Sequence, residues 1–206
     1  RDNPSLTVRR VPLDEDQRPP VRVVLDGRLS IAENEEVNVL KDGNPTIVFF
    51  SEMPTQAEQP TNTQGETYEF TRYGQAANLM LGCLGAPVAF KELPLDRSNS
   101  FKDGNFMLDA MWNELGAMGM ARNSRVMLEG GPETAKKFLS QGQITRAIII
   151  KADVEFKDPV PSGIDEEVLK SAGLEFVGTT KYGPDTAYCW KKAGTEWPQG
   201  GIESWP

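Results

Sequence analysis

One candidate ligand-binding site in this sequence is a glycine-rich turn at residues 129–132 (Glu-Gly-Gly-Pro). It lies between an apolar segment and a helical pattern, and ligands of open α/β sheets bind where a strand ends and a helix begins. The glycines let a ligand approach the backbone, and free N–H groups at a helix start attract phosphate. Glu129 can hydrogen-bond a polar substrate. The alternative is a tight turn whose glutamate faces solvent.

A second candidate site lies near the beginning of the sequence. Asp26 and Gly27 end an apolar run, and Arg9 and Arg10 precede that run as candidate cations. An arginine near a glycine turn can hold a phosphate through two parallel N–H donors. A solvated surface arginine is the alternative. The Asx-type sequence at residues 2–5 by itself indicates only a bend.

The lack of histidine and the small number of cysteines exclude several classes of enzyme. The sequence contains no histidine, which excludes Ser-His-Asp and Cys-His nucleophiles and histidine-ligated zinc. Two cysteines, Cys83 and Cys189, are too few for a zinc-dependent deaminase or a disulfide framework. We therefore expect buried reduced thiols and no metal.

Length, composition and charge favour a globular protein without nucleic-acid partners. The 206 residues are 38% hydrophobic and 25% charged, which is typical of one folded α/β domain. The net charge of -8 argues against a surface that neutralises nucleic-acid phosphates. Apolar runs are far shorter than the roughly 18–20 residues that span a bilayer. We expect a soluble protein of the cytoplasm or an organelle interior, such as a plastid, that is not secreted.

The apolar periodicity predicts the elements that would position these residues. Continuous apolar runs indicate strands covered on both faces at 21–25, 46–50, 88–90 and 124–129. Helical spacing predicts helices at 105–118, with methionines packed in the core, at 133–141, and at 165–171 after an Asp165 N-cap. Residues 124–152 are interpreted as a parallel β-α-β unit, 175–191 as a closing β-hairpin, and 53–66 as a surface loop.

Three separated motifs resemble one protein family. Residues 2–9 (Asp-Asn-Pro-Ser-Leu-Thr-Val-Arg), 20–26 (Pro-Val-Arg-Val-Val-Leu-Asp) and 126–134 (Val-Met-Leu-Glu-Gly-Gly-Pro-Glu-Thr) are similar to the C-terminal reductase domain of the riboflavin-biosynthesis deaminase/reductase proteins. The last hairpin adds Gly183-Pro184-Asp185, which resembles the Gly-x-Asp of the family. The resemblance implies a dihydrofolate-reductase-like fold, a three-layer α/β arrangement with a mixed sheet flanked by helices. It also implies use of NADPH and a homodimer or a place in a larger complex.

The resemblance further implies a reaction and a set of site residues. The reaction is reduction of the ribosyl side chain of 5-amino-6-(5-phosphoribosylamino)uracil, a pyrimidine ribotide, to ribityl. Substrate-contacting positions match Leu6, Arg9, as a clamp on the substrate phosphate, and Glu129, which would orient the sugar or assist a proton step. Cofactor-contacting positions match Asp2, Gly27, Gly131, Pro132, Glu133, Thr134, Ala135, Lys136 and Lys137. Hydride transfer suits a chain without histidine, because the cofactor carries the hydride.

The sequence departs from the family at two places. The family's domain begins several dozen residues earlier and includes a Ser-Leu-Asp-Gly segment absent here, so we expect that this chain is part of a longer protein or that another chain covers the gap. After Ala152 the family tends to continue with Ala-Pro and a glycine-containing loop, whereas this chain has 153–157 (Asp-Val-Glu-Phe-Lys). We expect a reductase-like domain over residues 1–192 and an irregular tail over 193–206 with Trp197 and Trp205.

Three functions are consistent with these motifs. The first is the NADPH-dependent pyrimidine reductase of riboflavin synthesis. The second is a reductase-like but catalytically inactive accessory or structural subunit of a larger assembly. The third is a related reductase that acts on a different substrate. Fold similarity cannot separate them, because function depends on the site.

Overall fold

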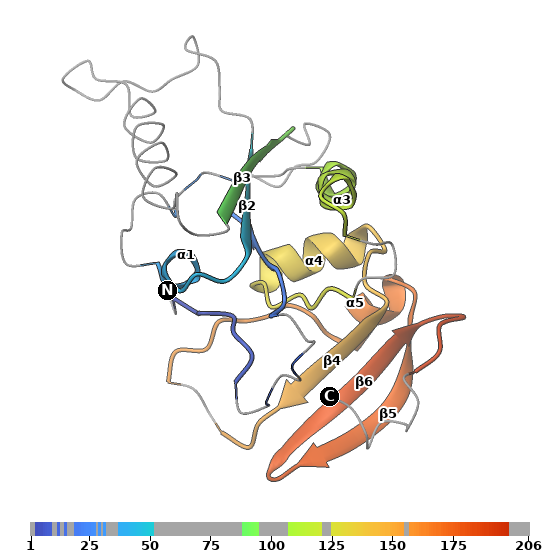
Figure 1. The fold of residues 1–206 in the computed structure, drawn as a ribbon. Coiled ribbons are helices and arrows are strands. Elements are labelled where there is room, and N and C mark those ends of the chain that lie inside the picture. Colours follow the sequence, from blue (N-terminus) through green and yellow to red (C-terminus); the bar gives the residue numbers. More distant parts are fainter. Residues whose placement is uncertain are drawn as a thin grey trace, which may run out of the picture. The chain divides into compact units, whose positions relative to one another are not determined.

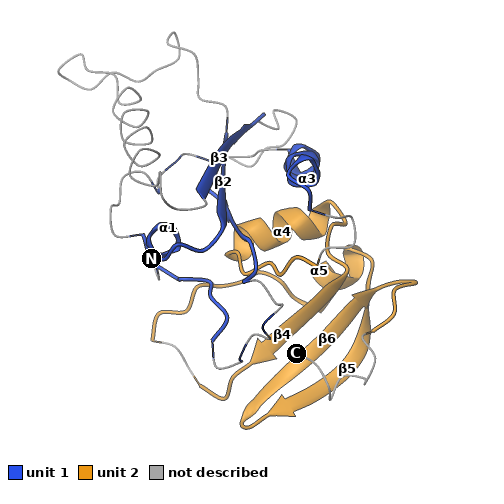
Figure 2. Ribbon diagram, in the orientation of Figure 1, with its two compact units in different colours: residues 1–123 blue, residues 124–206 orange. Residues whose placement is uncertain are grey.

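The computed structural model describes residues 3–9, 12, 15, 19–27, 29, 31, 37–51, 88–94, 107–120, 125–154 and 157–197 (Figure 1). The chain divides into two compact units, Arg1–Asn123 and Ser124–Pro206 (Figure 2). Several predicted features lie outside the described residues: Asp2, Arg10, the 53–66 loop, Cys83 and Trp205.

Unit 1 is built on a parallel three-stranded sheet. Its strands β1 (Arg22–Leu25), β2 (Thr46–Ser51) and β3 (Val88–Leu93) lie in the order β1-β2-β3. Every residue of the central strand β2 is buried. A central parallel strand is covered on both faces, which explains its continuous apolar sequence. All three predicted strands of this unit are confirmed, and β3 is longer than expected.

Among the described residues, unit 1 also contains two helices. The short α1 (Asn38–Lys41) connects β1 to β2 and was not predicted, because four residues show no periodicity. The predicted helix at 105–118 is confirmed as α3 (Leu108–Ala117), which buries Met111 and Leu115. Met107, by contrast, is 44% exposed, so the interpretation of the methionines as core residues holds only in part.

Unit 2 is an antiparallel sheet with two helices. Strands β4 (Arg146–Lys151), β5 (Leu174–Tyr182) and β6 (Asp185–Lys192) have the order β4-β6-β5, and β5 and β6 form the predicted hairpin. The helices are α4 (Pro132–Ser140) and α5 (Glu166–Ser171), and Asp165 caps α5 by accepting a hydrogen bond from the Val168 N–H at 2.9 Å. Helices and sheet share one core of Leu139, Leu169, Leu174 and Trp190. In the parts of the chain that the structure describes, no helix has both the length and the hydropathy to cross a bilayer.

The predicted strand at 124–129 is wrong, and so is the parallel β-α-β unit. The structure gives residues 125–130 no strand, and β4 pairs with the antiparallel strand β6. A strand requires a hydrogen-bonded neighbour, and the described residues provide none for this segment. Most of the segment is exposed instead, Val126 by 54% and Met127 by 80%, and Leu128 is half-buried. An apolar sequence alone therefore did not produce a strand here.

Cys189 lies buried on β6 as a free cysteine, in agreement with the expected reduced thiol. Burial raises the pKa of its thiol, because the thiolate loses hydration. The more reactive form of a cysteine is the thiolate. Cys189 is therefore an inert packing residue in the folded state.

Candidate functional site

The N-terminus of α4 is the best-formed candidate site in unit 2. Gly131 is its N-cap, no side chain caps the helix, and Pro132 at the first position lacks an N–H. The first backbone bond runs from the Ala135 N–H to the Gly131 carbonyl at 3.0 Å. Among the described residues, the N–H groups of Glu133 and Thr134 have no acceptor. They are oriented donors at the positive end of a helix, which suits a phosphate or another anion.

The predicted cofactor-contacting stretch 131–137 is not uniform in exposure. Gly131 and Glu133 are exposed, the next three residues are half-buried, and Lys137 is buried with 7% exposed. The Lys136 ammonium lies 3.5 Å from the Glu133 carboxylate. The accessible part of this stretch is therefore its first turn, where the unpaired N–H groups are.

The two glycines of the turn are under different constraints, which gives a prediction. A Cβ on Gly130 would lie 2.9 Å from the Thr134 Cβ, whereas a Cβ on Gly131 would meet no described atom within 4 Å. We expect Gly130→Ala to lower the free energy of unfolding by about 1–3 kcal/mol through overpacking. Gly131→Ala should cost less stability, because its methyl meets no described atom and only the N-cap becomes poorer, and it should weaken phosphate-ligand binding roughly ten-fold, because its methyl occupies the ligand's space. Chemical denaturation and ligand titration of both variants check this, and equal stability losses would contradict it.

Glu129 precedes this turn and is exposed. No hydrogen bond or ion pair joins its carboxylate to another described residue. Its oxygens are thus available to accept hydrogen bonds from a ligand bound near the helix start. The geometry therefore agrees with a substrate-facing carboxylate, although an exposed glutamate is equally ordinary at a protein surface.

In unit 1 the Asp26–Gly27 turn follows β1 at the edge where the parallel strands end. The Asp26 N–H donates to the Phe49 carbonyl at 2.9 Å, and the Gly27 carbonyl accepts from the Ser51 N–H at 3.2 Å. The Asp26 carboxylate accepts from the Ile31 N–H at 2.6 Å. The Asp26 carboxylate therefore stabilises the turn, and the backbone of Gly27 is hydrogen-bonded to the last residue of β2.

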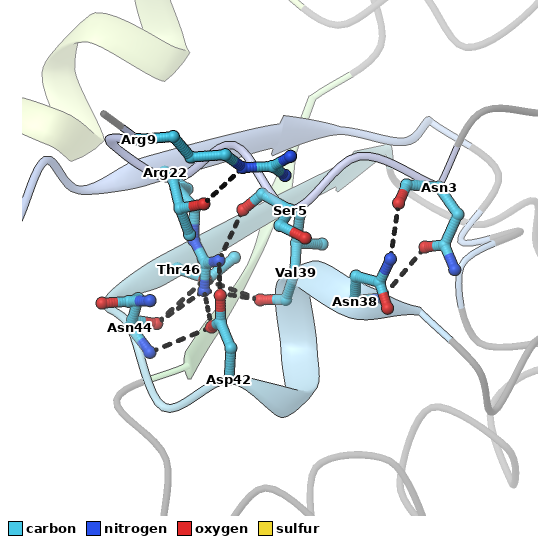
Figure 3. Close-up of polar contacts among 10 residues, drawn as sticks. Asn3, Ser5, Arg9, Arg22, Asn38, Val39, Asp42, Asn44 and Thr46 are labelled. Atoms are coloured by element: carbon cyan, nitrogen blue, oxygen red, sulfur yellow. Dashed lines mark hydrogen bonds and ion pairs between the residues drawn. The ribbon is translucent and has the colours of Figure 1, made fainter. Parts of the chain in front are cut away.

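The segment from Asn3 to Arg9 carries the predicted substrate residues of unit 1. Leu6 has a left-handed φ of 49° and packs against the buried cluster of Val39, Leu40 and Val48. The Arg9 Nε donates to the Thr7 hydroxyl at 3.2 Å (Figure 3). No described residue accepts from the terminal nitrogens of Arg9. Its two-pronged end is thus available to an anion.

A buried arginine that the sequence analysis did not single out organises this part of unit 1. The Arg22 side chain is 3% exposed and forms a two-pronged pair with Asp42, at 2.6 and 2.7 Å (Figure 3). It also donates to the Thr46 hydroxyl at 2.7 Å. The hydrogen bond from Arg22 is the main reason that the Asp42 pKa lies well below its usual range; burial opposes it, and backbone and side-chain hydrogen bonds from Asn44 add smaller lowering effects. The one signal in the sequence was an arginine inside an apolar strand.

This pair predicts a specific acid sensitivity. The pKa of Asp42 is lower in the folded state than its ordinary value of 3.8, so ionised Asp42 stabilises the fold above that value. The stabilisation is lost as the pH falls from about 5 through 3.8 toward the lower folded pKa. We expect the wild-type melting temperature to drop more over this range than that of Asp42→Asn, which should already be less stable at neutral pH. Melting curves followed by circular dichroism check this, and parallel pH profiles would contradict it.

The sequence-predicted site residues fall into one group in each unit. Leu6 and Arg9 share one segment of unit 1, where no hydrogen bond links them to Gly27 among the described residues. Glu129 and 131–137 are close together in the sequence of unit 2. Asp2 lies outside the described residues.

Comparison with known proteins identifies the family. The family model described as the RibD C-terminal domain matches residues 1–188. Matching solved structures include a diaminohydroxyphosphoribosylaminopyrimidine deaminase/5-amino-6-(5-phosphoribosylamino)uracil reductase from Thermotoga maritima, with a TM-score of 0.54 and 17% identity. That match covers 93% of this chain and 42% of the other, so the chain spans less than half of that protein. No curated protein sequence matches.

These matches confirm the expected mixed α/β, dihydrofolate-reductase-like fold. The family model also covers the three motifs on which the resemblance rested. The chain therefore belongs to the RibD C-terminal domain family.

Proposed function

We propose that this chain is an NADPH-dependent reductase of riboflavin biosynthesis, which reduces the ribosyl side chain of 5-amino-6-(5-phosphoribosylamino)uracil to ribityl. The observation that carries the proposal is family membership over residues 1–188. The similar protein from Thermotoga maritima is named as a reductase of this uracil compound, which supports the same reaction here. A homodimer or a place in a larger complex is part of the same proposal.

The start of α4 supports the cofactor. The unpaired N–H groups of Glu133 and Thr134, beside the open space at Gly131, fit a cofactor phosphate. When bound, NADPH supplies the hydride. The protein's own part is to bind and orient it, and the family resemblance assigns this role to Asp2, Gly27 and the stretch from Gly131 to Lys137.

The substrate would be held by the other predicted residues. Arg9 has a charged fork whose terminal nitrogens meet no described acceptor, which suits the substrate phosphate. Leu6 would offer an apolar contact beside it. Glu129 would accept a hydrogen bond from a sugar hydroxyl or assist a proton step next to the carbon that is reduced. Arg9 and Glu129 are exposed, and Leu6 is positioned by packing on the cluster around Val48.

The first experiment is a fluorescence titration of the native protein with NADPH, with NADH as the control. Saturable binding that favours NADPH and weakens in Gly131→Ala supports the cofactor assignment. Turnover of the ribosylaminopyrimidine is then followed by NADPH consumption. Absence of both binding and turnover overturns the proposal.

An alternative function is that of a catalytically inactive subunit of a larger assembly. Exposed apolar side chains in unit 2, Val126, Met127 and Ile150, favour it, because such side chains commonly mark contact surfaces. NADPH binding without turnover would instead favour a related reductase with a different substrate. The same titration and turnover assay therefore separates all three functions.

A further inference from the structure

The segment from Asn3 to Arg9 has a backbone that must be held in place from outside. Asn3 and Leu6 both have positive φ values, 41° and 49°. A left-handed conformation at a residue other than glycine costs about 1–3 kcal/mol and persists only where surrounding contacts impose it. For Leu6 this cost is notable, because leucine has no short polar side chain that could stabilise the left-handed turn locally.

Polar and apolar contacts with described residues of unit 1 hold the segment. Asn38 donates from its backbone N–H to the Asn3 side-chain oxygen at 2.9 Å, and from its amide group to the Asn3 carbonyl at 2.7 Å (Figure 3). Arg22 Nη1 donates to the Ser5 carbonyl at 2.8 Å. The Leu6 side chain packs on the cluster around Val48. The Arg22 bond is thus the polar anchor immediately before the strained Leu6.

Arg22 itself is rigidly fixed to the framework. Its Nη2 donates to the Val39 carbonyl at 2.8 Å and to the Asn44 carbonyl at 2.9 Å. Its Nε donates to the Thr46 hydroxyl at 3.1 Å. These acceptors belong to α1, to β2 and to the turn between them, in addition to the Asp42 pair. A buried side chain with so many fixed partners has one conformation. Arg22 therefore holds the Ser5 carbonyl at a fixed position relative to α1 and β2.

We propose that Arg22 is a positioning residue for the substrate phosphate: through the Ser5 carbonyl it fixes the strained segment that carries Leu6 and Arg9. This inference rests on the proposed function. Arg22 is almost fully buried and does not itself reach a ligand. It acts through Arg9, whose guanidinium is tied to the same segment by the Thr7 hydroxyl.

The test is Arg22→Lys, which keeps the charge but loses the planar fork. Hydrogen exchange should become faster in residues 3–9 than in the wild type, with a smaller change in β2. The KM for the phosphorylated substrate should rise roughly ten-fold, with kcat nearly unchanged and NADPH affinity intact. Arg146→Lys, in unit 2, is the matched control and should change neither readout.

A double-mutant cycle with Arg9→Ala distinguishes positioning from a general loss of stability. If Arg22 acts through Arg9, Arg22→Lys should have almost no further effect on KM once Arg9 is alanine. An undiminished effect overturns the proposal, and so does unchanged hydrogen exchange in residues 3–9. If Arg22→Lys does not fold, Thr46→Val removes one acceptor of Arg22 and should change both readouts in the same direction, to a smaller extent.

The two readouts also separate this inference from the proposed function. If the wild-type protein neither binds nor reduces the pyrimidine, the proposed function is wrong. The proposed role of Arg22 in substrate binding is then wrong as well. Hydrogen exchange would still show whether Arg22 holds the segment. Normal wild-type turnover with no effect of Arg22→Lys on KM overturns the inference alone.

Discussion

Replacing Glu129 by glutamine is expected to lower kcat for pyrimidine reduction by roughly 100-fold, the typical contribution of one group that moves or holds a proton. NADPH affinity should stay unchanged, because the cofactor phosphate is assigned to the N–H groups at the start of α4. Glutamine preserves shape and can still donate and accept hydrogen bonds, so the variant isolates the carboxylate charge and its proton. Steady-state kinetics and NADPH titration of the same preparation measure both quantities.

The control for this variant is Glu175→Gln, an exposed glutamate on β5 of the same unit. It removes the same charge and should leave kcat and KM unaffected. Turnover of Glu129→Gln equal to that of the wild type would reduce Glu129 to a surface residue of the turn. A rise in KM alone, at full kcat, would assign it to binding rather than to a proton step.

The elements that the sequence predicted well are those whose periodicity matches their burial. The continuous apolar run of β2 lies at the centre of a parallel sheet, and the helical spacing around Met111 lies in α3. The Asp165 cap was also predictable, because an aspartate N-cap acts within its own helix turn. These elements depend on patterns and contacts within their own segments, so they could be predicted from a single sequence.

Residues 125–130 show where this reasoning fails. Their apolar sequence resembles that of β2, yet the described residues provide them with no neighbouring strand, and Met127 is exposed. Strand formation depends on a partner that is distant in sequence, which a local pattern cannot reveal. The same limit applied to α1, which is four residues long and has no repeat to detect.

The open glycine turn before α4 could be predicted from the sequence, but the hydrogen bonds of Arg22 could not. Phosphate-binding turns have a local signature, and the Gly131 N-cap has the expected open backbone. Arg22, in contrast, meets partners 17 to 24 positions away in the sequence. Such a network follows from tertiary packing. The motif at 20–26 contained the arginine without showing what it does.

Replacing Arg22 by methionine is expected to lower the free energy of unfolding by about 3 kcal/mol or more, the usual cost of removing one member of a buried ion pair. Methionine fills much of the same volume but removes the hydrogen bonds that Arg22 donates to the Thr46 hydroxyl and to the Ser5 carbonyl. It also leaves the Asp42 carboxylate, 29% exposed, without its counter-charge. Urea unfolding at neutral pH measures the loss.

A second substitution shows how much of that loss comes from the unpaired charge. In the double variant Arg22→Met with Asp42→Asn, no ionised carboxylate remains at the site, so the combined loss should be smaller than the sum of the single losses. Arg146→Met is the control, because the Nε of Arg146 is buried without an acceptor among the described residues and its Nη2 donates only to the exposed Glu196 carbonyl, so its removal should cost little. Strictly additive losses at Arg22 and Asp42 would mean that the backbone carbonyls, rather than the ion pair, account for the stabilising effect of this arginine.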